Sequence, residues 1–202
     1  PGSPVSLAVQ GSELWAADMA GDRLYRFSEA EGVTRQIQVA THGCRDVVLD
    51  ADGSLWAVDF GGGVVRHLAA DGTMIGVLGR DLREPTAALP EGEEILVAEK
   101  GRDRIVRLNR SGIVCREYRH ERMRRPVDLV AARGGAIVQC QDGTLFWLRE
   151  EQDDLVGPLR ADGGDLVTSG LGLAIDAWDN LWWGDGASLR TAHRLPEDRP
   201  FQ

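Results

Sequence analysis

One short pattern recurs along this chain and limits its fold more than any other feature. ELWAAD begins at Glu13, SLWAVD at Ser54 and NLWWGD at Asn180, and each stretch ends in an acid. Alignment on this pattern gives five units whose equivalent positions lie 41, 40, 41 and 45 residues apart. These positions are Asp18, Asp59, Glu99, Cys140 and Asp185. Repeats of this period indicate a solenoid, a propeller or another array.

Each unit has the composition of short β-strands rather than of helices. Apolar runs rich in Val, Ile, Leu and Trp alternate with polar turns such as DADGS and EGEE. Asp-Gly pairs at 52–53, 71–72 and 142–143 supply the positive φ that tight hairpins need. Three strands are expected in every unit, and the first four units add a weaker fourth strand (RQIQV, MIGVLG, VCREY and DLVGPL). Units of four short strands predict an all-β protein, a β-propeller of five blades.

We predict one propeller domain over residues 1–202. The expected repeats span approximately 4–40, 44–82, 84–122, 125–165 and 169–195. The fifth repeat is incomplete, because only HRLPEDRPFQ follows its third strand at Ser188–Ala192. Three alternatives follow: a five-bladed ring, part of a six-bladed ring in a larger parent chain, or an oligomer whose partner chain completes the structure. Each must cover the open sheet edges, since exposed edges invite unwanted pairing.

The units resemble NHL repeats, most clearly in PVSLAVQGSELWAADMAGDRLYRF (4–27) and EPTAALPEGEEILVAEKGRDRIVRL (84–108). The Leu-Trp pair also resembles the second strand of virginiamycin B lyase propellers. That family implies catalytic histidines, a Glu-x-His element and a divalent metal, and the similar gluconolactonase-type propellers imply a Glu, Asn and Asp metal site. None of the four histidines follows Glu-x, and the two asparagines, Asn109 and Asn180, lie in expected turns. The resemblance therefore does not place either family's catalytic residues on this chain.

The repeated acid at the end of the second strand is interpreted as a fastener of the following loop. An arginine follows five residues later in two units, which predicts the ion pairs Asp18–Arg23 and Glu99–Arg104. Val64 occupies the arginine position in the second unit, and Cys140 replaces the acid in the fourth. A turn fastener tolerates such losses better than a ring of ligands does.

The Leu-Trp pair itself is interpreted as packing material. The tryptophans Trp15, Trp56 and Trp182 are expected to pack between neighbouring blades, because large aromatic side chains dominate the burial of apolar surface.

Ligands of propellers usually sit over the central channel, at loops that enter the first strand and leave the second. The candidate ligand-binding residues in these loops are Asp18, His42, Cys44, Arg45, Asp59, Phe60, Glu99, Lys100, Arg102, Arg125 and Asp185. A Cys–His pair such as Cys44 and His42 can make a nucleophile, but no third group to orient it is identifiable, so we predict no catalytic residue. A divalent cation held by the repeated acids is the alternative, since hard cations take oxygen ligands.

Charge is distributed unevenly along the chain. The formal net charge is -9, yet the stretch 100–125 contains ten basic residues and three acids. Overall acidity argues against non-specific nucleic-acid binding but leaves room for one basic face. We expect an acidic protein partner to dock on this stretch, with RNA as the alternative.

The remaining features of the composition bear on the cellular location and the source of the protein. Three widely spaced cysteines form neither a disulfide framework nor a metal signature. No apolar run is long enough to span a membrane and no signal peptide is visible, so a cytoplasmic location and no membrane partner are expected. An excess of arginine over lysine, with Lys100 the only lysine, favours a bacterial source.

Together these observations favour a non-catalytic propeller without a cofactor that binds a ligand or another protein. The alternatives are a metal-dependent lyase or hydrolase of the virginiamycin B lyase or lactonase type, and an RNA-binding NHL propeller.

Overall fold

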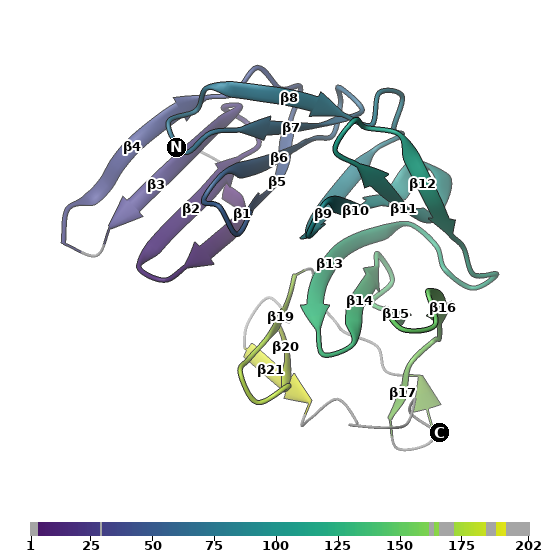
Figure 1. Cartoon of the computed structure of the whole chain (residues 1–202). Coiled ribbons are helices and arrows are strands. Elements are labelled where there is room, and N and C mark those ends of the chain that lie inside the picture. Colours follow the sequence, from purple (N-terminus) through teal and green to yellow (C-terminus); the bar gives the residue numbers. More distant parts are fainter. Residues whose placement is uncertain (1–3, 29, 162–163, 166–171, 185–188, 193–202) are drawn as a thin grey trace. The chain divides into compact units, whose positions relative to one another are not determined.

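The structure is a computed structural model, and it describes residues 4–28, 30–161, 164–165, 172–184 and 189–192. The fold is all-β and forms a β-propeller of five blades, as the repeats predict (Figure 1). Every blade is an antiparallel sheet whose strand order follows the chain. The strand ends match the expected turns, since Gly53, Gly72 and Gly143 of the three Asp-Gly pairs all have positive φ.

The first three blades each have four strands. Blade 1 consists of β1 (Pro4–Gln10), β2 (Glu13–Asp18), β3 (Arg23–Ser28) and β4 (Gly32–Gln38). Blade 2 consists of β5 (Cys44–Leu49), β6 (Leu55–Asp59), β7 (Val64–Leu68) and β8 (Met74–Leu78). Blade 3 consists of β9 (Pro85–Glu91), β10 (Glu94–Glu99), β11 (Arg104–Asn109) and β12 (Val114–Tyr118), with the 3-10 helix η1 (Lys100–Arg102) between β10 and β11.

The last two blades differ in their number of described strands. Blade 4 consists of β13 (Pro126–Ala132), β14 (Gly135–Cys140), β15 (Leu145–Arg149) and β16 (Asp154–Val156). A two-stranded hairpin follows, formed by β17 (Arg160–Ala161) and β18 (Gly164–Asp165). Blade 5 consists of β19 (Leu173–Ile175), β20 (Leu181–Gly184) and β21 (Leu189–Ala192). The predicted absence of a fourth strand concerns residues 193–202, which lie outside the described residues.

The chain divides into two compact units, and each is described by itself. Unit 1 contains residues 1–97 and 106–116, and unit 2 contains residues 98–105 and 117–202. The division passes through β10 and β11, so that the loop end of this hairpin belongs to unit 2. The prediction of one domain over the whole chain stays a prediction.

Among the described residues of unit 1, two apolar cores each lie between neighbouring blades. Trp15 packs with side chains of blade 2 such as Val47 and Leu55. Trp56 packs with side chains of blade 3 such as Ile95. Both indoles are no more than 1% exposed, so the predicted role of Trp15 and Trp56 between blades is confirmed. Burial of such a side chain contributes about 1.5–3 kcal/mol, so these tryptophans are major contributors to the stacking of the blades.

Unit 2 contains a smaller core formed by blades 4 and 5. Ile137 and Leu145 pack with Leu181 and, more loosely, with Trp183. The predicted packing residue of this blade, Trp182, is half-buried and lies on the opposite side of its strand from Trp183. Among the described residues, no helix is long and apolar enough to cross a membrane.

Candidate functional site

The repeated acid of blade 2, Asp59, has no exposed side-chain surface and accepts hydrogen bonds on both oxygens. Its Oδ1 accepts from the backbone N–H groups of His42 and Gly62, each 2.8 Å away. Its Oδ2 accepts from Arg66, with Nη2 at 2.7 Å and Nε at 3.2 Å. Arg66 lies on β7, seven residues beyond the acid. It forms the ion pair that Val64, at the expected arginine position, cannot form.

The repeated acid of blade 3 is held in the same way. Glu99 is fully buried and binds Arg102 at 2.6 Å and Arg104 at 2.5 Å, which confirms the predicted Glu99–Arg104 pair. Blade 1 departs from the prediction, because Arg23 donates its Nε to Gln38, 3.1 Å away, rather than to Asp18.

Blades 1 and 4 differ from blades 2 and 3 in the contacts at this loop end. Asp18 accepts a hydrogen bond from the backbone N–H of Gly21 at 3.2 Å. Cys140 offers no acceptor of this kind in blade 4, and the neighbouring Gln139 accepts from the backbone N–H of Gly172 at 3.1 Å. The described acids of the repeat, Asp18, Asp59 and Glu99, therefore accept hydrogen bonds from N–H groups of the following loop or from guanidinium groups.

The predicted Cys–His group is brought together at the ends of β5 and β6 but is poorly suited to nucleophilic catalysis. His42 is exposed and its Nδ1 lies 3.8 Å from the carboxylate of Asp59. Cys44 is buried, and this burial raises the pKa of its thiol to about 12. Burial likewise raises the pKa of the Cys140 thiol to about 12. Because the thiolate is the reactive form, neither thiol is a nucleophile near neutral pH.

The other candidate residues occupy three places. Phe60 donates its backbone N–H to the carbonyl of Gly43 at 3.1 Å, beside a half-buried Arg45. Lys100 begins η1, and the backbone N–H of Arg125 donates to Asp103 at 2.6 Å. The last candidate, Asp185, lies outside the described residues.

Metal ligands do not gather in the part of the chain that the structure describes. No three His, Cys, Asp or Glu side chains there lie close enough together to hold a metal ion. Of the four acids proposed as ligands, the three described ones are Asp18, Asp59 and Glu99. Asp59 and Glu99 are already bound by arginine, whose positive charge opposes cation binding at the same oxygens.

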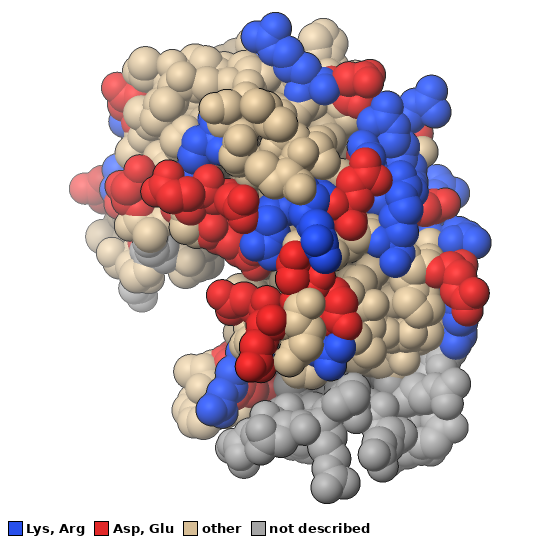
Figure 2. Space-filling model, turned by 45° about the vertical axis from the view of Figure 1, so that its right-hand side comes forward, with Lys and Arg blue, Asp and Glu red and all other residues tan. Residues whose placement is uncertain are grey.

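The basic stretch forms a hollow of about 490 Å³ in unit 2, which we call the basic hollow. It is lined by Arg102, Asp103, Arg119, His120, Glu121 and Arg124. The Arg119 side chain is 53% exposed and pairs with Glu117 at 3.3 Å. Arg124 donates to the carbonyl of Met123 at 2.9 Å and makes no ion pair with a described residue. Figure 2 shows that the basic side chains of this face are interleaved with carboxylates rather than forming an unbroken patch.

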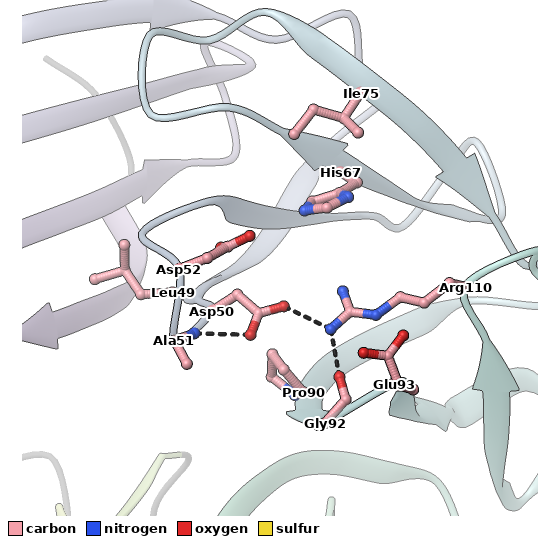
Figure 3. A pocket seen from close by; sticks show the side chains of 10 residues that line it. All are labelled: Leu49, Asp50, Ala51, Asp52, His67, Ile75, Pro90, Gly92, Glu93 and Arg110. Atoms are coloured by element: carbon pink, nitrogen blue, oxygen red, sulfur yellow. Dashed lines mark hydrogen bonds and ion pairs between the residues drawn. The ribbon is translucent and has the colours of Figure 1, made fainter.

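A larger hollow, of about 650 Å³, lies in unit 1 and was not expected from the sequence (Figure 3). We call it the Asp50–Arg110 hollow. Its walls are Leu49, Asp50, Ala51, Asp52, His67, Ile75, Pro90, Gly92, Glu93 and Arg110. Its volume lies in the range of small-molecule sites, and its mixture of apolar walls with a few polar groups is typical of them.

An ion pair crosses this hollow. Arg110 donates its Nη2 to Asp50 at 2.9 Å and also to the carbonyl of Gly92, as the dashed lines of Figure 3 show. Its guanidinium carbon lies 5.0 Å from the centre of the Trp56 ring. The Nε and Nη1 donors of Arg110 make no hydrogen bond with a described residue, so they remain available to a ligand.

The protonation states in the hollow follow from its contacts. Burial opposes ionisation of Asp50, but hydrogen bonds from Trp56, Ala51 and Arg110 outweigh it and lower the pKa of this carboxyl. His67 stacks on the Trp56 ring at 3.8 Å, with 5° between the ring planes. Its burial and the positive charge of Arg110 lower the pKa of His67, so the imidazole is neutral at pH 7.

One sequence signal could have indicated part of this hollow. DADGSLW and DAWDNLW share an Asp six residues before a Trp, and in both the indole N–H donates to that Asp: Trp56 to Asp50 at 3.0 Å and Trp182 to Asp176 at 2.9 Å. No such signal exists for Arg110, because it is 60 residues from Asp50 and belongs to another blade.

The class of protein is therefore a β-propeller of five blades with two hollows of mixed polarity. No protein-family model matches the chain, and no curated protein matches its sequence significantly. Membership of the NHL-repeat family therefore stays a prediction, whereas the propeller fold is shown by the structure.

Solved structures match the whole chain at the level of fold. Virginiamycin B lyase from Staphylococcus aureus has a TM-score of 0.72 and 13% identity, covering 98% of this chain and 72% of that chain. A streptogramin B lyase has a TM-score of 0.74 and 12% identity, covering 99% of this chain and 72% of that chain. The computationally designed Ika8 protein has a TM-score of 0.64 and 13% identity, covering 94% of this chain and 58% of that chain. At these identities the similarity shows the fold alone.

Proposed function

We propose that this chain is a non-catalytic propeller module that binds its ligand in the Asp50–Arg110 hollow. The observation behind this proposal is the convergence of open donors and apolar walls in that hollow. Arg110 presents Nε and Nη1 without a described partner, while Leu49, Ile75 and Pro90 supply apolar surface. The non-catalytic part rests on the described repeated acids, which fasten loops, and on the buried thiols of Cys44 and Cys140, which are protonated near neutral pH.

The chemistry of the hollow defines the class of ligand. Guanidinium donors call for an acceptor oxygen, and carboxylate and carbonyl oxygens bind them well. The neutral His67 and the apolar walls favour an uncharged or apolar remainder. We therefore propose a small amphipathic molecule, or the equivalent side chain of a partner protein, with one acceptor group next to an apolar group.

Binding can be tested by following backbone amide signals during titration with a panel of small amphipathic carboxylates and amides. We expect at least one probe to shift the amides of Ala51, His67 and Gly92. Arg110→Leu should abolish this response, and Arg80→Leu, which changes an exposed arginine outside the hollow, should leave it intact. A panel without any binder, or binding that persists in Arg110→Leu, would contradict the proposal.

The basic hollow favours a second binding function, the docking of an acidic protein partner on the stretch 100–125. Its supporting observation is Arg124, whose guanidinium has no described carboxylate partner although it lines the hollow. Tyr118 is the only aromatic residue of the stretch and is buried, which disfavours base stacking and therefore RNA.

A salt titration separates these two partners. Poly-glutamate and single-stranded RNA would serve as probes, with binding measured from low to physiological salt. We expect Arg119→Glu with Arg124→Glu to remove poly-glutamate binding, and we expect RNA binding to be weak even at low salt, where phosphate contacts are strongest. Tight RNA binding that is lost in the same variant would identify RNA, rather than an acidic protein, as the partner of this hollow.

The enzyme alternative comes from the names of the similar structures. One solved structure in this group is virginiamycin B lyase with quinupristin. The direct test is incubation of this protein with quinupristin and magnesium, followed by chromatographic separation and tandem mass spectrometry of the quinupristin, because an elimination that opens a ring leaves the mass unchanged. We expect no conversion, and conversion above the rate without protein would overturn the non-catalytic proposal.

A further inference from the structure

His67 is held at the wall of the Asp50–Arg110 hollow by a chain of hydrogen bonds. Its Nε2 lies 2.7 Å from the hydroxyl oxygen of Ser54. The hydroxyl and the backbone N–H of Ser54 both hydrogen-bond to Asp52 and lower the pKa of its carboxyl. An ionised carboxylate only accepts hydrogen bonds, and a hydroxyl has one proton to donate. Ser54 therefore donates to Asp52 and accepts from His67, so the neutral imidazole carries its proton on Nε2.

The second ring nitrogen of His67, Nδ1, is open to solvent at the wall of the hollow. It makes no hydrogen bond with a described residue. The buried side-chain atoms without a partner, among the residues that the structure describes, are the indole nitrogens of Trp15 and Trp147. Nδ1 is therefore accessible, on a side chain that lines the hollow (Figure 3). With the proton on Nε2, Nδ1 has a free lone pair and accepts hydrogen bonds.

The hollow thus offers both a donor and an acceptor to a ligand. Arg110 supplies Nε and Nη1 as donors, and His67 supplies Nδ1 as the acceptor. Both side chains lie against Trp56, with the imidazole stacked at 3.8 Å and the guanidinium carbon 5.0 Å from the ring centre. A primary carboxamide is the simplest group that matches them, because its carbonyl oxygen accepts and its NH₂ group donates.

The charge of the walls favours a neutral group over an anion. Three carboxylates and one guanidinium line the hollow, so its formal charge is -2 while His67 is neutral. The guanidinium of Arg110 is already paired with Asp50 at 2.9 Å. A ligand carboxylate would face this negative charge and would place an oxygen lone pair opposite that of Nδ1. Neither cost applies to a carboxamide.

We propose that the hollow selects a primary carboxamide over the corresponding carboxylate, with Arg110 as the donor and His67 as the acceptor. This inference rests on the proposed binding function and narrows the class of its ligand. His67 is then the residue that determines specificity, because Arg110 alone accepts either group as a partner.

Acid weakens this selection. Burial and the charge of Arg110 lower the pKa of His67, so Nδ1 is an acceptor at pH 7. Below that pKa Nδ1 carries a proton, and it then donates to a carboxylate instead of accepting from a carboxamide. The strand neighbours of the ring, Trp56 and Gly76, are uncharged. The charged groups that face the ring or line the hollow with it are Asp50, Asp52, Glu93 and Arg110.

Three probes that share one apolar group test the selection in the wild-type protein. Phenylacetamide has the acceptor and the donor, N,N-dimethylphenylacetamide lacks the donor, and phenylacetate is charged. Titrations followed by backbone amide signals at pH 7 give each Kd. We expect phenylacetamide to bind about tenfold more tightly than either of the other probes, which corresponds to one hydrogen bond. From about pH 7 to about pH 5, where phenylacetate stays ionised, its disadvantage should shrink.

The outcomes separate this inference from the binding function. Equal affinities for the three probes would overturn the selection alone, whereas the failure of all three to bind would contradict the binding function as well. His67→Phe keeps a ring to stack on Trp56 but has no ring nitrogen. In this variant we expect phenylacetamide and its dimethyl analogue to bind alike, without the pH dependence. A tenfold preference that persists in His67→Phe would overturn the role of His67.

Nitrogen NMR of the His67 ring tests the tautomer without any ligand. We expect the proton on Nε2 in the wild type at pH 7, and we expect Asp52→Ala to weaken this preference, because Ser54 is then free to donate to Nε2. Asp71→Ala is the matched control and should leave the His67 signals unchanged. Asp71 accepts the backbone N–H of Thr73 at 2.8 Å, as Asp52 accepts that of Ser54 at 2.9 Å, but it lies outside the hollow. A proton on Nδ1 of the wild type would overturn the inference.

Discussion

Arg66 holds the fully buried carboxylate of Asp59 through two hydrogen bonds, with Nη2 at 2.7 Å and Nε at 3.2 Å from Oδ2. The Arg66 side chain is itself only 16% exposed. Two charges buried together depend on each other, because removal of one leaves the other without compensation in a medium of low dielectric constant.

We therefore predict that Arg66→Met lowers the free energy of unfolding by about 3–5 kcal/mol, measured by urea denaturation. The control is Arg26→Met, which removes the ion pair between Arg26 and Glu13. Because both of these side chains are 39% exposed, this change should lower the free energy of unfolding by less than about 1 kcal/mol. Asp59→Asn combined with Arg66→Met should cost less than the sum of the single changes. Equal losses of unfolding free energy in Arg66→Met and Arg26→Met would contradict the conclusion that the buried pair depends on both of its charges.

A second prediction compares two tryptophans that differ in their polar contact. Trp56 donates its indole N–H to Asp50 at 3.0 Å, whereas Trp15 Nε1 has no hydrogen-bond partner among the described residues. Both are no more than 1% exposed, so a change to Phe removes the same volume from two similar cores. Trp56→Phe should lower the free energy of unfolding by about 1.5–3 kcal/mol more than Trp15→Phe, which is the contribution of a hydrogen bond to a charged group. Thermal or urea unfolding of both variants measures the difference, and no difference would show that the indole contact is unimportant.

A third prediction concerns acid. Burial opposes ionisation of Asp176, but hydrogen bonds from Asn180 and Trp182 outweigh it and lower the pKa to about 2 from the usual 3.8. Because the folded pKa is depressed, Asp176 contributes stability at pH values above 3.8, and this contribution is lost as the pH falls from 3.8 through about 2. Carboxyl NMR titration should give a midpoint near 2 in the wild type and a higher midpoint in Trp182→Phe. An unchanged midpoint in the variant would show that the hydrogen bond from Trp182 does not lower the pKa of Asp176.

A fourth prediction concerns the three thiols. Cys115 is exposed, whereas Cys44 and Cys140 are buried and burial raises the pKa of each to about 12. A thiol reagent at pH 8 should therefore modify the native protein at Cys115 alone, and denatured protein at all three positions. Cys115→Ser should abolish the native reaction. Rapid modification of Cys44 in the native protein would contradict this prediction and would support a nucleophilic Cys44–His42 pair.

The fold followed from the sequence because its determinants are local and repeated. The Leu-Trp pair, the Asp-Gly turns and the period of about 41 residues are visible without any knowledge of distant contacts, and they fix strand position and blade number. The burial of Trp15 and Trp56 and the pair between Glu99 and Arg104 follow from the same local pattern.

The candidate site depended on contacts that the repeat does not encode. Arg66 rather than Val64 binds Asp59, because Arg66 is two positions further along β7, on the same side of the sheet, and its long side chain extends back to the buried acid. Arg110 meets Asp50 only because blades 2 and 3 stack, which joins positions 60 residues apart.

The exposure of blade 1 was also decided by tertiary structure. Leu7 and Val47 occupy equivalent positions of the repeat, yet Leu7 is 66% exposed and Val47 is fully buried. The sequence by itself determined that each lies on the side of its sheet opposite the repeated tryptophan, Trp15 or Trp56, since alternation along a strand is a local property. Only the tertiary structure decided that Val47 is buried against blade 1, because burial depends on what packs against a side chain and not on the residue alone.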